Sequence, residues 1–307
     1  MDKNLRSRLE SISCGEVMFD CSLARYTSYA IGGPADALIV VHNREKIAPL
    51  LALLESESLS WRVIGKGSNL LVRDAGYRGV VIILGKELSL VDEDETRGNE
   101  TVSLRVGAGC SLTKLNHHCC NVGLGGMEFS YGIPGTVGGA VLMNAGAWGK
   151  EMADVISDVG VVTQSGYAKL RGKQLDFTYR QWPGFSSYIG RGLIVDVALT
   201  LKHVDPQILA KKTKELLEKR KEIQPHNYPN GGSVFKNPQN DSAGRLIDEC
   251  RLKGRAVGGA MVSDKHANFI INKDKATSAD VLSLMKTIQC EVKKRFDVEL
   301  EPEIHVM

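Results

Sequence analysis

The sequence lacks long hydrophobic runs and has little excess charge. Nowhere do eighteen consecutive apolar residues occur, and the N-terminal MDKNLRSRLESISC is charged. These absences argue against a transmembrane span and a signal peptide, so we expect a soluble cytoplasmic protein with no membrane partner. The formal net charge of +3 is too small to indicate a nucleic-acid partner, although it would not repel a phosphorylated substrate.

The cysteine pattern favours neither disulfides nor a metal. The seven cysteines are an odd number and none stands at CxxC spacing, which points to a reducing compartment. The run His117-His118-Cys119-Cys120 looks like a ligand cluster. However, adjacent helical residues point about 100° apart, and no second ligand pair follows at zinc spacing. We therefore expect no metal site.

The common nucleotide-binding motifs are also missing. The chain has no GxxxxGK[ST], and no GxGxxG opens a helix after a strand. P-loop hydrolysis and a Rossmann-type dinucleotide site are therefore not supported. Glycine itself is plentiful. It accounts for 32 of the 307 residues, which is above its usual share of ~7%, and it is concentrated in a few blocks. Three glycine-rich loops without those motifs suggest a dinucleotide that is held in another way.

The longest glycine-rich stretch covers residues 125–151, GGMEFSYGIPGTVGGAVLMNAGAWGKE. Each glycine inside a helix costs about 0.5–1 kcal/mol relative to alanine, so we expect no helix here. The stretch is also too apolar for a flexible linker, because Val137, Val141 and Leu142 need burial. Glycine lets backbone amides approach a ligand closely. We interpret the stretch as the floor of a cofactor site.

Two shorter loops also offer consecutive backbone amides to a phosphate. They are IGGPAD at residues 31–36 and GKGSN at residues 65–69. Taken alone, each loop is better explained as a plain turn.

Hydrophobic periodicity predicts an α+β fold without regular βαβ repeats, because strands dominate the first two-thirds and helices alternate with short strands in the last third. A polar loop or hairpin is expected at residues 92–100. The helices are expected within 1–20, after Asn43, over 112–121, from Pro206 to before Pro225, over 243–250 and from about Ala279. In the helix from Pro206, Leu209, Leu216 and Ile223 are predicted to share one face.

Eight segments carry a more specific signal. They are YTSYAIGGPAD (26–36), IGKGSNLLVRD (64–74), GMEFSYGIPGTVGGAVLMNAGAWGKE (126–151), FTYR (177–180), GGSVFKNP (231–238), AGRLID (243–248), KHANFIIN (265–272) and LEPEI (300–304). Together they closely resemble the motifs of the UDP-N-acetylenolpyruvoylglucosamine reductase family, in the right order and over nearly the whole chain. The compact length resembles the shorter of the family's two subtypes.

The resemblance implies an α+β fold with an FAD-binding domain of the vanillyl-alcohol-oxidase type. This domain would cover residues 1–204 in two subdomains, roughly 1–75 and 76–204, and a smaller α+β substrate-binding domain would cover 205–307. The family makes UDP-N-acetylmuramate for peptidoglycan from UDP-N-acetylglucosamine enolpyruvate, with NADPH as reductant. The flavin-binding motifs contain no histidine or cysteine, so we expect non-covalent FAD. We also expect a monomer.

The residues that match the flavin-binding motifs are expected to bind FAD. They are Ile31, Gly32, Gly33, Gly65, Gly67, Ser68, Asn69, Leu70, Gly126, Gly132, Pro134, Gly135, Thr136, Gly138, Gly139, Asn144, Ala145 and Gly146.

The family reaction delivers a hydride to the outer vinyl carbon and leaves negative charge on an enolate, which needs a cation and a hydrogen-bond donor. By motif match Arg180 is the cation, and its planar fork suits a carboxylate. Ser233 is the matched proton donor to the inner carbon. Glu303 would stabilise the enolate if protonated, which requires a raised pKa. The positions that resemble substrate contacts are Tyr179, Lys236 and Asn237.

Each assignment has a simpler alternative. Without the resemblance, Ser233 would be a turn serine, Arg180 a surface arginine and Glu303 a solvated charge near the end of the chain. An oxygen-using flavin oxidase on the same scaffold and a non-enzymatic nucleotide-sugar binding module also stay open. The sequence departs from the family at one place. The family usually has a serine two residues after the arginine, and here residues 181–183 are Gln-Trp-Pro, which puts the local loop and its substrate contacts in doubt.

Overall fold

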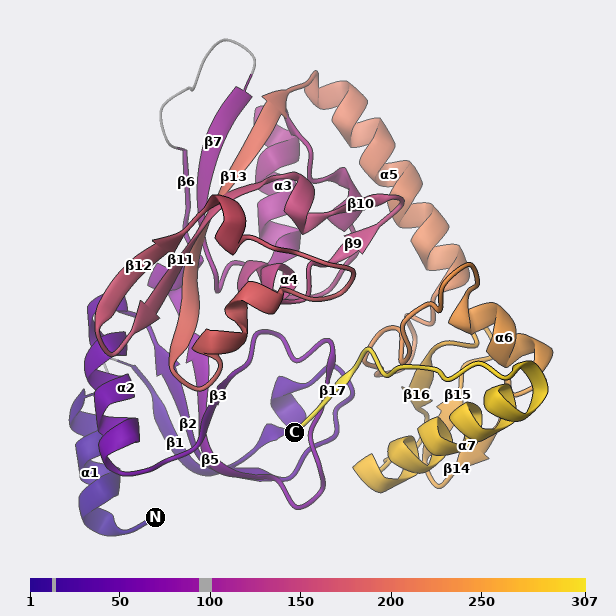
Figure 1. Cartoon of the computed structure of the whole chain (residues 1–307), viewed down its shortest axis with the longest axis horizontal. Coiled ribbons are helices and arrows are strands. Elements are labelled where there is room, and N and C mark those ends of the chain that lie inside the picture. Colours follow the sequence, from indigo (N-terminus) through magenta and orange to yellow (C-terminus); the bar gives the residue numbers. More distant parts are fainter. Residues whose placement is uncertain (13–14, 94–100) are drawn as a thin grey trace. The chain divides into compact units, whose positions relative to one another are not determined.

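The computed structural model describes residues 1–12, 15–93 and 101–307, so most of the predicted loop at 92–100 lies outside the described residues. Helices and strands are mixed without regular βαβ alternation, and the predicted α+β class is confirmed (Figure 1). The chain forms two compact units, each made of several segments. Unit 1 comprises Met1–Phe19, Asp36–Gly65 and Gly79–Glu218; unit 2 comprises Asp20–Ala35, Lys66–Arg78 and Lys219–Met307. The sequence predicts one continuous domain over residues 1–204 and another over residues 205–307. This division stays a prediction.

A six-stranded antiparallel sheet is the framework of unit 1. It has the order β12-β11-β13-β7-β6, and β8 also pairs with β13. The strands are β6 (Val91–Glu93), β7 (Thr101–Gly107), β8 (Leu124–Gly125), β11 (Ile156–Thr163), β12 (Gly166–Leu170) and β13 (Gly192–His203). β13 is twelve residues long and rich in valine and leucine, as expected for a strand buried between neighbours.

Helices α3 (Leu112–Val122) and α4 (Val137–Leu142) pack on one face of this sheet and complete its hydrophobic core (Figure 1). The predicted limits of α3 are confirmed, because the Ser111 side chain accepts from the Lys114 amide at 3.1 Å and Gly123 has φ +71°. A fully buried valine or leucine in this core contributes about 1.5–3 kcal/mol.

The prediction that residues 125–151 contain no helix is wrong, because α4 lies within them. Its first turn contains Gly138 and Gly139, and the Thr136 hydroxyl accepts from the Gly139 amide at 3.3 Å. Val137 and Val141 are fully buried. Burial and the cap offset the cost of two glycines, about 0.5–1 kcal/mol each.

A second sheet, of four strands in the order β1-β2-β5-β3, belongs mostly to unit 1. Its strands are β1 (Val17–Ser22), β2 (Pro34–Val41), β3 (Trp61–Val63) and β5 (Tyr77–Leu84), and helices α1 (Lys3–Ile12) and α2 (Ile47–Ser56) pack with them. The expectation of one helix within residues 1–20 is wrong in its second half. Val17 begins a strand beside β2, and there the Val40 amide donates to the Glu16 carbonyl at 2.9 Å.

Unit 2 is built around α7 (Ser278–Phe296) and a three-stranded sheet. The other elements are α6 (Ala243–Glu249), β14 (Ala256–Val257), β15 (Ala260–Val262) and β16 (Ile270–Asn272), with the two-stranded sheet of β4 (Leu70–Leu71) and β17 (His305–Val306). The predicted capping box of α7 is confirmed: the Thr277 hydroxyl accepts from the Asp280 amide, and the Asp280 carboxylate accepts from the Thr277 amide.

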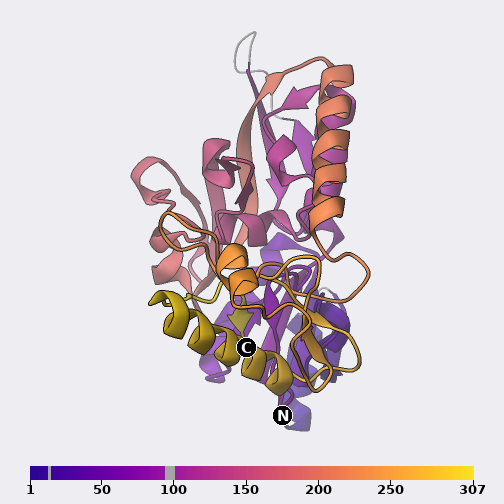
Figure 2. The ribbon, with the colours of Figure 1, turned by 90° about the vertical axis from the view of Figure 1, so that its right-hand side faces the viewer.

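Helix α5 (Pro206–Ile223) follows β13 and is one continuous helix (Figure 2). Its Leu209 is buried, whereas Ile223 is 46% exposed. The predicted apolar face therefore does not extend to the end of the helix. At both ends the helix has the expected limits, Asp205-Pro206 and Pro225.

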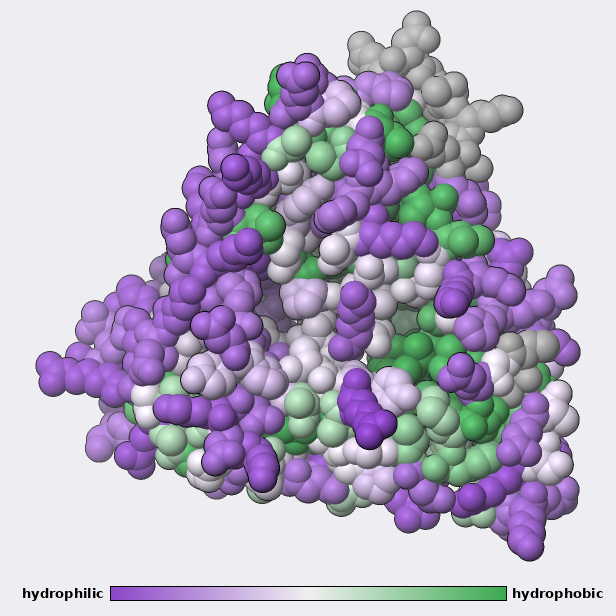
Figure 3. All heavy atoms as spheres, turned by 180° about the vertical axis from the view of Figure 1, so that it is seen from behind, coloured by the Kyte–Doolittle hydropathy of each residue, from purple (hydrophilic) through white to green (hydrophobic). Residues whose placement is uncertain are grey.

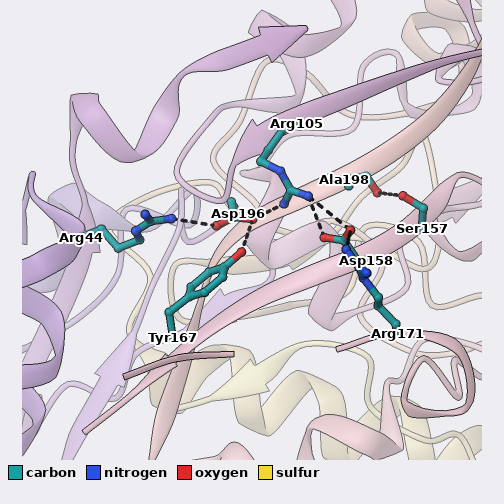
Figure 4. Close-up of polar contacts among 8 residues, drawn as sticks. All are labelled: Arg44, Arg105, Ser157, Asp158, Tyr167, Arg171, Asp196 and Ala198. Atoms are coloured by element: carbon teal, nitrogen blue, oxygen red, sulfur yellow. Dashed lines mark hydrogen bonds and ion pairs between the residues drawn. The ribbon is translucent and has the colours of Figure 1, made fainter. Parts of the chain in front are cut away.

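A polar cluster lies on β7, β11 and β13 of unit 1 (Figure 4). Arg105 pairs with Asp196 at 2.5 Å and with Asp158 at 3.0 Å, and Arg171 reaches Asp158 at 3.2 Å. Burial alone would lower the pKa of the Arg105 guanidinium, but the two carboxylates raise it above its ordinary value.

Two further side chains complete the cluster around Asp196. Arg44 lies 3.6 Å from this carboxylate, and the Tyr167 hydroxyl donates to it at 3.2 Å (Figure 4). Burial and the negative charge of Asp196 raise the pKa of Tyr167 to about 12. The negative charges of Asp158 and Asp196 are thus offset by arginine side chains, and Asp196 also accepts the hydrogen bond from Tyr167.

No helix among the described residues is long and apolar enough to cross a membrane. On the face shown in Figure 3, hydrophilic side chains predominate and hydrophobic ones form smaller groups.

Candidate active site

The predicted site residues are divided between the two units. Unit 1 contains Gly65, the stretch 125–151 and the pair Tyr179-Arg180, and unit 2 contains the loops 31–33 and 66–70, Ser233, Lys236, Asn237 and Glu303.

In unit 2, backbone hydrogen bonds join the segments that carry Ser233 and Glu303. The Glu303 amide donates to the Val234 carbonyl at 2.8 Å, and the Lys236 amide donates to the Glu301 carbonyl at 2.9 Å. Phe235 and Pro302 form the antiparallel bridge between these two bonds. The predicted proton donor and the predicted acid therefore lie on adjacent segments.

The loop 66–70 runs beside the same C-terminal segment. The Asn69 amide nitrogen donates to the Glu303 carbonyl at 3.0 Å, and the His305 amide donates to the Asn69 carbonyl at 3.0 Å. Parallel pairing of β4 with β17 continues this contact through Leu70 and Leu71. A loop predicted to bind FAD is thus fixed next to a predicted catalytic residue.

The loop that ends at Gly33 packs against the same region of unit 2. The Ser28 hydroxyl donates to the Asn230 carbonyl at 2.6 Å and to the Gly67 carbonyl at 3.2 Å. The Gly33 amide donates to the Arg73 carbonyl at 3.0 Å. The two loops that sequence analysis treated separately are therefore parts of one arrangement.

The glycines of these loops are required by close backbone approach. A Cβ on Gly33 would lie 2.2 Å from the Asp74 carbonyl oxygen. One on Gly67, whose φ is +58°, would lie 2.2 Å from the Tyr26 carbonyl oxygen.

Loop 66–70 also fits an anion such as the FAD pyrophosphate. Within the described part of the chain, the amides of Lys66 and Gly67 donate no hydrogen bond to the protein. Successive unpaired amides around a left-handed residue form a concave site for anions. The residues present are therefore compatible with the cofactor that the sequence implies.

The two predicted substrate contacts of unit 2 already have partners. Lys236 forms an ion pair with Glu301 and its side chain is 19% exposed. The Asn237 side-chain oxygen accepts from the Ala243 amide at 3.0 Å, at the beginning of α6.

The sequence motifs assigned no role to Asn268, which holds the Ser233 segment. Its side chain accepts from the Phe235 amide at 3.0 Å and donates to the Phe235 carbonyl at 2.8 Å. The signal for it is an asparagine inside the otherwise apolar run ANFII, since a buried amide side chain requires partners.

Tyr29 is a second residue to which the sequence motifs assigned no role. It is fully buried, and a Cβ on Gly231 would lie 2.2 Å from its ring. Burial raises the pKa of the Tyr29 phenol above its ordinary value. The ring thus supports the backbone two residues before Ser233.

Asp74 anchors the end of the loop that begins at Lys66. Its carboxylate accepts from the Ser278 amide at 2.9 Å and from the Ser278 hydroxyl at 2.8 Å, at the beginning of α7. Burial alone would raise the pKa of Asp74, but the hydrogen bonds from Ser278 and Ala279 together lower it. The loop is thus tied to the longest helix of unit 2.

In unit 1, Gly65 lies against the glycine-rich stretch. A Cβ on Gly65 would lie 2.4 Å from the Thr136 hydroxyl oxygen. The Gly135 carbonyl accepts from the Leu112 amide at 3.1 Å, and Gly138 donates to the Ala108 carbonyl at 2.8 Å. This part of the stretch is therefore fixed on the residues around the beginning of α3.

The first part of the stretch 125–151 forms hydrogen bonds, an ion pair and turns within unit 1. The Gly126 amide donates to the Glu128 carboxylate at 2.5 Å, and Lys212 pairs with the same carboxylate at 3.1 Å. Gly132, with φ +75°, and Pro134 lie in the turns before α4.

Arg180 lies on a tight turn of unit 1. The Thr178 and Gln181 amides each donate to the carbonyl of the other residue, at 2.9 Å and 3.1 Å. Arg180 has φ +59°, which is uncommon for a residue other than glycine. Its guanidinium donates to the Gly146 carbonyl at 3.0 Å and lies 5.1 Å from the ring centroid of Tyr179, whose side chain is 48% exposed.

The unusual Gln-Trp-Pro sequence after Arg180 serves packing. Trp182 is buried and its indole nitrogen donates to the Gln174 carbonyl at 2.9 Å. Its ring centroid lies 5.0 Å from that of Phe177 and 5.2 Å from that of Phe185. The departure from the family pattern thus anchors the turn that carries Arg180.

Comparisons with known proteins show which family this chain resembles. Residues 224–307 match the family described as UDP-N-acetylenolpyruvoylglucosamine reductase, C-terminal domain, and residues 35–169 match an FAD binding domain. A UDP-N-acetylenolpyruvoylglucosamine reductase of Symbiobacterium thermophilum is 43% identical over 92% of this chain and 90% of its own length. One of Bacillus pumilus is 37% identical over 99% of this chain and 98% of its own length.

A solved structure gives the same result. The crystal structure of UDP-N-acetylenolpyruvylglucosamine reductase from Thermus caldophilus matches with a TM-score of 0.77 and 37% identity, over 95% of this chain and 98% of that one. The resemblance found in the sequence motifs is confirmed. The chain therefore belongs to the UDP-N-acetylenolpyruvoylglucosamine reductase family.

Proposed function

We propose that the chain reduces UDP-N-acetylglucosamine enolpyruvate to UDP-N-acetylmuramate, with non-covalently bound FAD as cofactor and NADPH as reductant. The observation that carries the proposal is the arrangement in unit 2, where the Ser233 segment pairs with the Glu303 segment and the loop 66–70 lies beside Glu303. A reaction that joins cofactor chemistry to protonation of carbon needs such an arrangement.

The residues proposed to hold FAD are the motif residues of the loops 31–33 and 65–70 and of the stretch 126–146, with Asn144 taking part through its backbone alone. When bound and reduced, FAD supplies the hydride that the outer vinyl carbon of the substrate receives. The amides of Lys66 and Gly67 are suited to the pyrophosphate, because they form no hydrogen bond within the described residues.

Hydride addition leaves a negative charge on an enolate that is shared with the substrate carboxylate. Arg180 is proposed to pair with this charge through its planar guanidinium. Glu303, in its protonated form, donates a hydrogen bond to the same enolate. Ser233 gives its proton to the inner carbon, which completes the addition of one hydride and one proton across the double bond.

Other residues are proposed to bind the substrate. Tyr179 borders Arg180 and is half exposed, so its ring is available to a ligand. Lys236 and Asn237 follow Ser233 directly in the sequence. Because Lys236 is paired with Glu301, binding of the anionic UDP-sugar requires exchange or sharing of that ion pair.

The cellular role follows from the reaction. We propose a cytoplasmic monomer in peptidoglycan precursor synthesis, hence a protein of cell-wall biogenesis on which cell shape and division depend. We also propose an FAD-binding domain over residues 1–204 and a substrate-binding domain over 205–307.

An anaerobic visible absorption spectrum tests the proposal. We expect a yellow protein whose flavin bands bleach on addition of NADPH and return on addition of the enolpyruvyl substrate. A colourless protein that FAD does not reconstitute would contradict the proposal and favour a nucleotide-sugar binding module. Rapid reoxidation by oxygen without turnover of the enolpyruvyl substrate would favour a flavin oxidase.

A further inference from the structure

The side chain of Asn144 joins three segments of unit 1. Its amide nitrogen donates to the Thr178 carbonyl at 3.0 Å, and its oxygen accepts from the Ala153 amide at 3.0 Å. Asn144 is fully buried and has φ +40°, a conformation in which asparagine is one of the few tolerated residues. Both ends of its carboxamide are thus bonded to the protein backbone.

The Thr178 carbonyl belongs to the turn that presents Arg180. It accepts from the Gln181 amide, which closes the turn, and from Asn144. Arg180 itself has φ +59°, and such a conformation persists only where surrounding contacts fix it. Asn144 supplies one of those contacts from the glycine-rich stretch.

The same stretch holds the guanidinium as well. The Gly146 carbonyl, two residues after Asn144, accepts from Arg180 Nη2 at 3.0 Å. Residues 144–146 therefore fix the backbone of the turn through one bond and the charged group through another.

We propose that Asn144 is a positioning residue for Arg180, and that its side chain does not act as a ligand of the flavin. The proposal rests on the proposed function for its kinetic consequences, because Arg180 is there the partner of the enolate. Loss of the Asn144 side chain impairs the substrate reaction and leaves flavin binding in place.

The main test is the variant Asn144→Gly, because glycine tolerates the positive φ while removing the carboxamide. Flavin content and the rate of flavin reduction by NADPH are expected to stay within about twofold of the parent protein. Reoxidation by the enolpyruvyl substrate is expected to fall about tenfold to a hundredfold, with a raised KM, since small misplacements of a catalytic group have effects of this size.

A second variant, Asn144→Asp, keeps the test informative if Asn144→Gly does not fold. It keeps the oxygen that accepts from Ala153 and replaces the donor to Thr178 by an acceptor. The same loss in the substrate half-reaction is expected.

Asn116→Ala is the matched control. Asn116 is also a buried asparagine of unit 1, but its side chain accepts a hydrogen bond from Ser130, away from the Arg180 turn. Its flavin reoxidation is expected to stay within about twofold.

A readout without cofactor or substrate separates this proposal from the proposed function. Hydrogen exchange of the Gln181 amide in the flavin-free protein is expected to be about tenfold faster in Asn144→Gly than in the parent or in Asn116→Ala. If exchange accelerates while the parent protein does not turn over the enolpyruvyl substrate, the proposed function fails and the positioning role stands.

Three results would overturn the positioning role. The first is loss of flavin from Asn144→Gly with normal reoxidation in the fraction that keeps flavin, which would make Asn144 a flavin ligand. The second is unchanged exchange of the Gln181 amide. The third is an equal loss of reoxidation in Asn116→Ala, which would indicate a general effect on stability.

Discussion

In unit 2 backbone hydrogen bonds join the segments of Ser233 and Glu303, whereas in unit 1 side-chain contacts hold the turn of Arg180. A backbone ladder depends little on which side chains it carries. A turn with a positive φ at arginine depends on each contact that fixes it. The comparison teaches that, of these two places, the turn of Arg180 is the more sensitive to a single substitution.

The largest expected effect comes from removing the proposed proton donor, Ser233, while the backbone pairing of its segment with the Glu303 segment stays intact. Ser233→Ala is expected to slow flavin reoxidation by the enolpyruvyl substrate by a factor of about 10²–10⁴, because a general acid is lost. Flavin reduction by NADPH should persist. Rapid-mixing absorbance measurements of the two half-reactions separate these steps, and Ser283→Ala, at an exposed serine of α7, is the control. Reoxidation near the parent rate would show that Ser233 is not the acid.

The next effect probes how much unit 1 depends on one side chain. Arg105→Ala leaves Asp158 and Asp196 without their shared cation. Breaking a buried ion pair costs about 3–5 kcal/mol, so we expect destabilisation near the lower end, since the Arg105 side chain is 22% exposed. Urea unfolding measures the change, with Arg62→Ala at an exposed arginine as control. Equal stabilities of the two variants would contradict a structural role for the cluster.

A smaller effect is expected where unit 2 does depend on a side chain. Asp74→Asn weakens the bonds to the beginning of α7, which should cost about 0.5–1 kcal/mol, as for other helix caps. The folded state lowers the pKa of Asp74. The stabilisation is therefore complete above the unfolded pKa of about 3.9 and is lost as the pH falls through the lower folded value.

Thermal unfolding at several pH values checks this dependence. The parent protein should exceed Asp74→Asn in stability at pH 7, and the difference should shrink as the pH falls below the unfolded pKa of about 3.9. A difference that is constant with pH, or that grows in acid, would show that the charge of Asp74 does not contribute.

The smallest effect is expected from Asn69→Ala, the counterpart of the Asn144 variants. Asn69 donates to the Glu303 carbonyl, but the pairing of β4 with β17 and the bond from Glu303 to Val234 would remain. With FAD added to saturation, we therefore expect flavin reoxidation to change by no more than about threefold. Rapid-mixing measurements of Asn69→Ala beside Asn144→Gly test the comparison directly. Equal losses in both variants would mean that the ladder does not hold Glu303 by itself.

Local signals in the sequence predicted much of the fold. Ser111 and Gly123 marked the ends of α3, and Thr277 with Asp280 marked the beginning of α7. These signals act within a few residues, so they can be read without the rest of the chain. The helix inside the glycine-rich stretch escaped prediction, because its stability comes from burial of Val137 and Val141 against a distant sheet.

By itself, the sequence determined the α+β class, the family and the motif positions expected to bind the flavin and substrate, since these follow from short segments in a fixed order. Only the tertiary structure decided what those residues touch. Asn69 bonds to Glu303 and Asn144 to Thr178, across separations of 234 and 34 residues. A motif names a residue type at a position, but the partner of a hydrogen bond is set by how distant segments pack.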